Sequence, residues 1–369
     1  MNRIQKVNAN RIRSSAAALV PVLCSVVVFN FLSSACGKRE EQVMAKPVFF
    51  AVVQTDSETG QKVIVLERRG ESPLVARIAP QSGANLFSLQ YEGRELLHVP
   101  ESLDKLPGFR YGTPVLYPTP NRVAGGKFAF EGRSFDFGLN DGDRFLHGLV
   151  HSVPWEFEEP SADENGASVL VYLDFSPGSR LHRLFGFDHR LNLKFTVDSL
   201  GIRFGYTVDN RDSLSIPYGF ALHPYFIYLG EREQTYLTVP ATGHMEAVNL
   251  MPTGGVEPLE GGAYDLTGGR SLAELDLDDV YIGMVPDNPA FIEYRDAGVK
   301  VTLKASAGFT HMVVYTQQPA FFCVENQTCS TDAHNLYARG LKDISHLLTV
   351  RPGSKDTGWV HYLLTSSGD

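Results

Sequence analysis

The side chains best suited to proton transfer and polar recognition lie in four short segments. Each segment combines histidine, arginine, asparagine or a carboxylate with aromatic or apolar neighbours, a setting in which polar groups become partly buried and chemically distinctive. The segments are TPVLYPTPNRVAGGKFAFEGRSF (113–135), RFLHGLVHSVPW (144–155), ALHPYF (221–226) and FFCVENQTCSTDAHN (321–335). A single histidine such as His223 is more typical of a satisfied core position, so the four segments have to be interpreted together.

Several familiar catalytic motifs are missing from the sequence. It has no Gly-rich phosphate loop with its lysine, no HExxH, no CxxC and no GxSxG. Nucleotide-binding, zinc protease and serine hydrolase interpretations therefore lose support. The chemistry must come from scattered histidines, carboxylates and arginine.

In this order, with DDVY (278–281) between the third and fourth, the four segments resemble the aldose 1-epimerase family, the galactose mutarotase-like proteins. The resemblance extends from about residue 75 to about residue 364. It implies one large β-supersandwich that interconverts the α and β anomers of free monosaccharides. It implies neither a cofactor nor a metal ion.

Anomer exchange needs a base that takes the proton from the C1 hydroxyl and an acid that protonates the ring oxygen. The resemblance implies that Glu325, in CVENQT, is the base and that His223, in ALHPYF, is the acid. Taken alone, Glu325 would be an exposed strand carboxylate. Many family members have proline after this glutamate, whereas this chain has Asn326, so the resemblance fixes the aim of the carboxylate less firmly.

The resemblance also implies residues that bind sugar hydroxyls. Asn121 and Arg122 lie in PNRV, where the arginine would offer its fixed fork of donors, and His147 lies in LHG. A surface arginine and a turn histidine are the plain alternatives. Asp278 and Asp279 are adjacent, and successive strand residues point to opposite faces, so only one can serve; we choose Asp278.

His151 bears on the class of sugar. The hexose 6-phosphate branch of the family has an arginine shortly after the histidine-glycine pair, where it can meet the phosphate, and this chain has His147-Gly148-Leu149-Val150-His151. A histidine is mostly neutral at pH 7 and is a poorer phosphate partner than arginine. We therefore expect a free aldose, with a hexose 6-phosphate as the alternative. Three aromatic residues could stack on the sugar or belong to the core, namely Trp155, Tyr225 and Phe226.

The first 35 residues predict export. They carry four basic residues and no acid, followed by an apolar segment from Ala16 to Leu32. LSSACG (32–37) resembles a bacterial lipoprotein cleavage box, which predicts a lipid on Cys36 and a membrane anchor. Because Leu32 stands four residues before the cysteine instead of three, ordinary cleavage to a soluble periplasmic protein and an uncleaved anchor stay open. Residues 36–47 read as a tether.

The remainder, residues 48–369, predicts one all-β domain. Of 369 residues 43% are hydrophobic and 20% charged, which is typical of a globular chain with a large core. Short β-type runs recur, among them KVIVLERR (62–69), SVLVYLDF (168–175) and KVTLKA (300–305). LNLKFTV (191–197) and IRFGYTV (202–208) flank a glycine-containing turn and predict a hairpin. We expect a large antiparallel β-sandwich.

Two cysteines lie in this domain, and we expect Cys323 and Cys329 to be buried free thiols, because an extended strand would keep them apart. In such a strand Cys323 and Glu325 share one face, and burial there would raise the pKa of Glu325.

The balance of charge argues against one class of partner. The whole chain has a net charge of −9, and removal of residues 1–35 takes four of its 33 basic residues and none of its 42 acids. Nucleic acid is therefore an unexpected partner. A membrane-tethered carbohydrate-binding module without turnover remains the competing class, and a polysaccharide lyase or hydrolase domain is a third.

Overall fold

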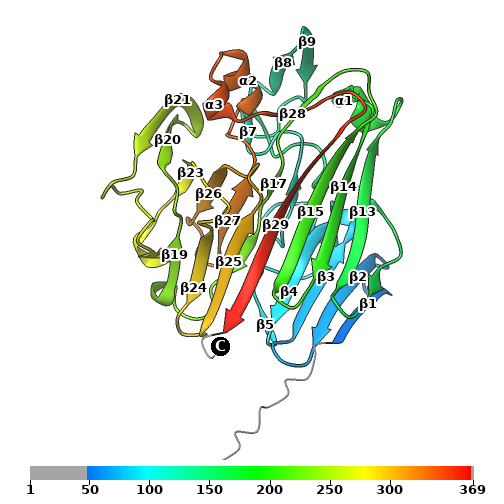
Figure 1. Ribbon diagram of the computed structural model, residues 1–369, viewed down its shortest axis with the longest axis vertical. Helices are drawn as coiled ribbons and strands as arrows, with labels where there is room; N and C mark the ends of the chain where they lie inside the picture. Colours follow the sequence, from blue (N-terminus) through cyan, green and yellow to red (C-terminus); the bar gives the residue numbers. More distant parts are fainter. Residues whose placement is uncertain (1–47, 367–369) are drawn as a thin grey trace, which may run out of the picture. The chain divides into compact units, whose positions relative to one another are not determined.

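Antiparallel β-sheets make up nearly all the regular structure of residues 48–366, the part of the chain that this computed structural model describes (Figure 1). The expected all-β antiparallel architecture is confirmed. These residues belong to one unit in which strands distant in sequence pair with one another. The predicted export signal, the tether and Cys36 lie outside the described residues.

The largest sheet has ten strands, and its central strand is the last one of the chain. β29 pairs with β15 on one side and with β25 on the other (Figure 1, red). The strands, in spatial order, are β11 (Glu156–Phe157), β13 (Ala167–Phe175), β14 (His189–Val197), β15 (Gly201–Asn210), β29 (Lys355–Ser366), β25 (Val299–Ala305), β24 (Ala290–Tyr294), β19 (Thr235–Thr238) and β22 (Arg270–Ser271), with β12 (Ser161–Ala162) beside β13.

The second sheet has eight strands and carries most of the candidate site. In spatial order they are β21 (Met251–Pro258), β20 (Gly243–Val248), β23 (Asp278–Ile282), β26 (His311–Tyr315), β27 (Phe321–Gln327), β17 (Ala221–Leu222) and β6 (Val115–Leu116), with β18 (Tyr225–Ile227) also pairing with β27.

A third sheet is a meander of five consecutive strands, and short elements complete the unit. The meander consists of β1 (Val48–Thr55), β2 (Lys62–Arg69), β3 (Leu74–Ala79), β4 (Asn85–Tyr91) and β5 (Arg94–Glu95). Three two-stranded ribbons pair β7 (Arg122–Ala124) with β10 (Arg144–Leu146), β8 (Lys127–Phe130) with β9 (Arg133–Asp136), and β16 (Ile216–Tyr218) with β28 (Leu348–Val350). The α-helices are short: α1 (Arg180–Leu184), α2 (Ala333–Ala338) and α3 (Lys342–Ser345).

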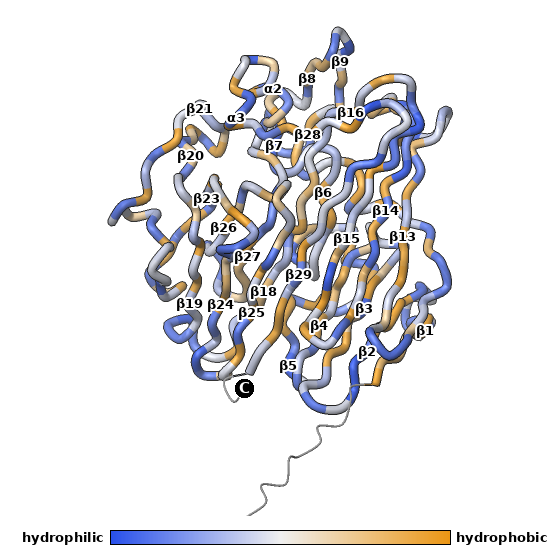
Figure 2. The backbone as a smooth tube through the Cα atoms, viewed as in Figure 1, coloured by the Kyte–Doolittle hydropathy of each residue, from blue (hydrophilic) through white to orange (hydrophobic). Residues whose placement is uncertain are grey.

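The local patterns in the sequence explain these strands. The predicted runs coincide with β2, β13 and β25, and the predicted hairpin is β14–β15. Its turn is stabilised by the Asp198 carboxylate, which accepts hydrogen bonds from the N–H groups of Leu200 and Gly201. Alternate residues of β14 are fully buried, as expected for a strand with one face on the core. Hydrophobic residues accordingly follow the strands, and hydrophilic ones gather in the loops (Figure 2).

The core lies between the sheets and supports the strands of the site from behind. The Phe226 ring, on β18, contacts Phe322 of β27 and Tyr362 of β29. All three rings are fully buried, so they tie the eight-stranded sheet to the ten-stranded one. Cys323 and Cys329 are buried free thiols, as predicted. Within residues 48–366, no helix is long and apolar enough to cross a membrane.

Candidate active site

One cavity collects six of the seven residues that the sequence suggested for catalysis and sugar binding. Its volume is about 320 Å³, within the range of small-molecule sites. The six residues are Asn121, Arg122, His147, His223, Asp278 and Glu325. They come from the four chemistry-bearing segments and from DDVY, so the cavity exists only in the folded chain.

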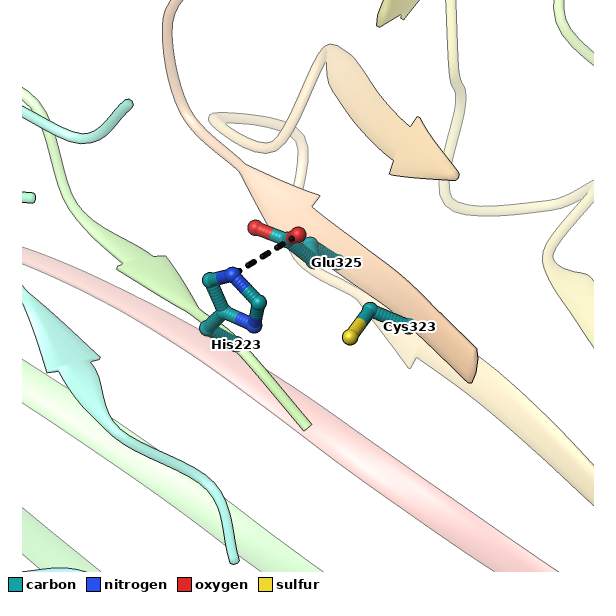
Figure 3. Close-up of side chains that lie close together, drawn as sticks. All are labelled: His223, Cys323 and Glu325. Carbon is teal, nitrogen blue, oxygen red and sulfur yellow. Dashed lines mark ion pairs between the residues drawn. The ribbon is translucent and has the colours of Figure 1, made fainter. Parts of the chain in front are cut away.

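The two proposed proton-transfer residues face each other in this cavity. Nε2 of His223 lies 3.3 Å from Oε1 of Glu325 (Figure 3). Both side chains are almost entirely removed from solvent, with 6% of His223 and 2% of Glu325 exposed. An acid and a base in such contact at a cavity wall can exchange protons with a bound ligand.

His223 is held by the short break between β17 and β18. Its backbone N–H donates to the Pro114 carbonyl oxygen, and its ring stacks on the Tyr225 ring with centroids 4.6 Å apart. The His147 ring meets it edge-on at 4.9 Å. Packing on two sides therefore fixes the plane of the imidazole, as expected for the residue that precedes the Pro224 turn.

Glu325 is held by β27, whose seven residues are all buried. Phe322 and Val324 point into the core, whereas Cys323 and Glu325 share the other face, as predicted. β27 continues in register through Asn326, opposite Met312. The strand ladder, not a proline turn, therefore aims this carboxylate.

A second residue on the same face orients the carboxylate further. Gln327, two positions along β27, donates a hydrogen bond of 3.0 Å from Nε2 to Oε2 of Glu325. The other carboxylate oxygen, Oε1, is the one that faces His223. The amide thus occupies one oxygen and leaves the second for the ligand side.

Burial shifts the pKa values of Glu325 and His223 in opposite directions. Loss of solvation raises the pKa of Glu325 well above its usual value, and it lowers the pKa of His223 to about 3. The rise at Glu325 agrees with the sequence prediction. A carboxylic acid beside neutral imidazole has the same proton count as a carboxylate beside imidazolium, so one proton shared by the pair would serve a single acid and a single base.

The other wall of the cavity is built from strained backbone. Asn121 and His147 both adopt left-handed φ angles, +57° and +69°, which are uncommon outside glycine. The His147 N–H donates to the Asn121 carbonyl oxygen at 2.8 Å, and Leu146 pairs with Arg122 across β10 and β7. Such strain persists only where the surrounding structure enforces it, and it clusters at functional sites.

Arg122 and Asp278 are each oriented by a neighbour. Nε of Arg122 donates to the Asp141 carboxylate at 2.9 Å, and Nη1 donates to Oδ1 of Asn121 at 3.2 Å. Asp278 and Asp279 separate as predicted: Asp278 lines the cavity, and burial raises its pKa.

Asp279, which also lines a small neighbouring depression, instead anchors the strand that carries Asp278. It bonds Nε2 of His244 at 2.8 Å and accepts the N–H of Asp278 at 3.1 Å. The Tyr264 ring stacks on His244 with centroids 3.8 Å apart. The backbone of Asp278 is therefore fixed from outside the cavity.

One of the sequence interpretations needs correction, and an alternative left open for the aromatic residues is decided. His151 does not line the cavity, although its ring packs against Phe109, which lines the cavity together with His147. His151 lines a separate depression near Gly148. Phe226 and Trp155 belong to the core, where Trp155 donates its indole N–H to the Val150 carbonyl, so of the three aromatic candidates only Tyr225 reaches the cavity.

Sequence reasoning missed half of the lining. The additional residues are Phe109, Arg110, Leu146, Val313, Tyr315, Gln317 and Phe321. Phe109 and Arg110 lie in a loop without regular structure, and Arg110 has a φ of +94°. No local sequence pattern marks the loop that carries Phe109 and Arg110. Phe321, by contrast, lies in the segment 321–335, which is among the four chemistry-bearing segments.

These observations define a class: a large antiparallel β-sandwich with a sugar-sized cavity and a carboxylate–imidazole pair in its wall. The aldose 1-epimerase family model matches residues 73–362, and the chain belongs to this family. Its members form an enzyme family of isomerases, and the resemblance noted in the sequence is thereby confirmed.

Two curated relatives share stretches of this region. Pig galactose mutarotase is 25% identical over 228 residues, which are 59% of this chain and 62% of that protein. The uncharacterized protein YihR of Escherichia coli is 28% identical over 149 residues, which are 39% of this chain and 44% of that protein. The chain therefore spans less than two thirds of the length of either relative.

Solved structures show the same fold at low identity. A galactose mutarotase-like protein from Clostridium acetobutylicum superposes with a TM-score of 0.77 at 19% identity, over 87% of this chain and 99% of that one. Galactose 1-epimerase from Lactobacillus acidophilus gives a TM-score of 0.69 at 18% identity, over 86% and 98%. The expected galactose mutarotase-like sandwich is confirmed.

Proposed function

We propose that this protein is an aldose 1-epimerase that equilibrates the α and β anomers of a free aldose such as glucose or galactose. The observation that carries the proposal is the contact of 3.3 Å between His223 and Glu325 in the wall of the cavity. Family membership and the activity for which the pig relative is named support the reaction class.

The reaction needs only proton transfers between the sugar and these two residues. The Glu325 carboxylate takes the proton of the C1 hydroxyl while the protonated His223 gives its proton to the ring oxygen, and the C1–ring oxygen bond breaks. Rotation about the C1–C2 bond turns the aldehyde over. On closure the two protons return, so the enzyme ends in its starting state and either anomer forms.

The remaining polar residues of the cavity bind the hydroxyl groups in this proposal. Arg122 offers the donors that Asp141 and Asn121 leave unused, and Asp278 accepts from sugar hydroxyls. His147 and Asn121 complete the polar wall. Because His151 lies outside the cavity, it no longer supports the preference for a free aldose over a hexose 6-phosphate. That preference now rests on the segment around Arg122.

Polarimetry of freshly dissolved α-D-glucose and α-D-galactose tests the proposal. The protein should accelerate the approach to the equilibrium rotation. Glu325→Gln should lose about 10²- to 10⁴-fold of this rate, because an amide cannot accept the C1 proton.

Glu274→Gln is the matched control, since the Glu274 side chain is 61% exposed and lies outside the cavity. It should keep the full rate. Sugar binding without acceleration by the native protein would instead favour a carbohydrate-binding module. Activity confined to hexose 6-phosphates would refute the preference for a free aldose.

We also propose that the chain is exported and anchored through a lipid on Cys36, facing the periplasm or the cell surface. The support is the basic, apolar and small-residue order of residues 1–36. Cys36→Ala should shift the protein from the membrane fraction to the soluble fraction and abolish incorporation of labelled fatty acid. Labelling that survives this substitution would contradict the anchor.

A further inference from the structure

A third donor, the Cys323 thiol, lies beside the Glu325–His223 pair. Cys323 stands two residues before Glu325 on β27, so both side chains leave the same face of the strand toward His223 (Figure 3). One donor atom from each of the three residues lies within 4.8 Å of the other two. All three side chains are buried, and Cys323 has no exposed surface.

A nitrogen, a sulfur and a carboxylate oxygen form a donor set that suits zinc. Zn²⁺ binds imidazole nitrogen, thiolate and carboxylate in tetrahedral sites, and three protein ligands leave the fourth position for a small molecule. Here the fourth position would open toward the cavity that His223 and Glu325 line.

The spacing of the donors also suits a tetrahedral ion. Two ligand atoms about 2.0 Å from such an ion are separated by about 3.3 Å, and sulfur at about 2.3 Å widens this to about 3.6 Å. Nε2 of His223 and Oε1 of Glu325 are already 3.3 Å apart. A rotation of the Cys323 side chain that moves its sulfur by about 1 Å closes the remaining gap.

The hydrogen bonds around the three residues leave the donors free. Gln327 occupies Oε2 of Glu325, so Oε1 is available and the carboxylate is already oriented. Nδ1 of His223 has no hydrogen-bond partner within residues 48–366, so binding of an ion at Nε2 breaks no hydrogen bond at the other nitrogen of the ring. Metal binding would therefore cost little in protein hydrogen bonds.

We propose that His223, Cys323 and Glu325 form a site for a thiophilic divalent cation, best matched by Zn²⁺, and that the bound ion excludes the sugar reaction. The S–H bond of Cys323 breaks as its sulfur binds the ion, the proton shared by Glu325 and His223 is displaced as well, and both protons go to solvent. The ion occupies the lone pairs that proton transfer needs. The inhibitory part rests on the proposed epimerase function, whereas the binding part does not.

Titration of the full chain with Co²⁺ tests the binding directly, because cobalt bound to thiolate shows a charge-transfer band in the near ultraviolet. One such band should saturate at one ion per chain and disappear on addition of Zn²⁺. Cys323→Ser should remove it. Cys329→Ser is the matched control, because Cys329 is also a buried thiol but lies outside this cluster, and it should keep the band.

A second measurement links the site to activity. Zn²⁺ should slow mutarotation at least tenfold at saturation and a chelator should restore the rate. With each protein compared to its own rate in chelator, Cys323→Ser should need at least tenfold more Zn²⁺ for the same inhibition.

Absence of the cobalt band, or a band that survives in a folded Cys323→Ser protein, would overturn the proposal. A cobalt band in a protein that has no mutarotase activity would contradict the proposed function but would still support the metal site. Zn²⁺ inhibition that is equal in native and Cys323→Ser proteins would refute the link between the two.

Discussion

At the scale of residues, the site depends on polar groups that the fold has removed from water. A buried carboxylate and a buried imidazole in contact interact strongly with any proton between them, because little solvent screens them. Glu325 is oriented by Gln327, and His223 by the stacked Tyr225 ring. Both side chains are thus held in position before a ligand binds, so proton transfer to the ligand needs little rearrangement of the protein.

Arg122 gives a test of sugar binding at this scale. Arg122→Lys removes the planar fork, so the Michaelis constant for the aldose should rise about tenfold while the turnover number changes little. Steady-state polarimetry separates the two. Arg144→Lys is the control, because Arg144 also contacts Asp141, at 3.4 Å, but lies outside the cavity lining. An equal rise in both variants would mean that the effect runs through Asp141 and not through the sugar.

At the scale of elements, the cavity is positioned by pairings between short strands and loops. His147 lies in the cavity wall directly after β10, which pairs with β7, where the backbone is left-handed at both His147 and Gly148. Gly148 has a φ of +71°, and a Cβ at this position would lie 2.3 Å from the Tyr117 carbonyl oxygen. Only glycine fits both the backbone angle and the space.

Gly148→Ala should therefore destabilise the protein by about 2–4 kcal/mol, from backbone strain and from the displaced Tyr117 carbonyl. Chemical denaturation measures this loss. Gly60→Ala isolates the strain, because Gly60 has the same φ of +71° and a Cβ there would meet no described atom within 4 Å. It should cost only about 1 kcal/mol. Equal losses would show that the close approach to Tyr117 is unimportant.

At the scale of the whole molecule, several histidines are folded into the core as neutral rings. Burial lowers the pKa of His189 to about 4, of His311 to about 3 and of His334 to about 4. His189 donates from Nδ1 to the Phe187 carbonyl, which leaves Nε2 to accept from the Tyr117 hydroxyl at 2.8 Å. These rings stabilise the fold only while they stay uncharged.

Stability should consequently fall as the pH drops from about 6.5 toward 4. The unfolded chain binds protons at its histidines below about pH 6.5, whereas the folded chain does so only near its lowered pKa values. Each of the three histidines should cost about 2 kcal/mol between pH 6.5 and 5.

Urea unfolding at pH 7 and pH 5 measures this difference. His311→Asn should remove about 2 kcal/mol of the pH dependence, whatever its effect at pH 7. The same pH dependence in the variant and the native chain would contradict the assignment of His311 as a neutral core group.

The sequence alone determined what depends on local period and residue type. The two-residue period of a strand placed Cys323 and Glu325 on one face, and it showed that only one of Asp278 and Asp279 could serve in the site; the choice of Asp278 came from the family resemblance. The runs of β2, β13 and β25 and the β14–β15 hairpin followed from the same alternation. These features need no knowledge of which strands lie side by side.

Only the tertiary structure decided which distant groups meet. His223 and Glu325 are about a hundred positions apart in the chain and come together because β17 and β18 both pair with β27. Phe109 and Arg110 line the cavity from a loop whose path no local pattern fixes, and His151, which contacts Phe109, does not line it. The physical reason is that packing between sheets, with many long-range contacts acting together, sets the paths of loops, whereas hydrogen bonding and side-chain alternation set the strands.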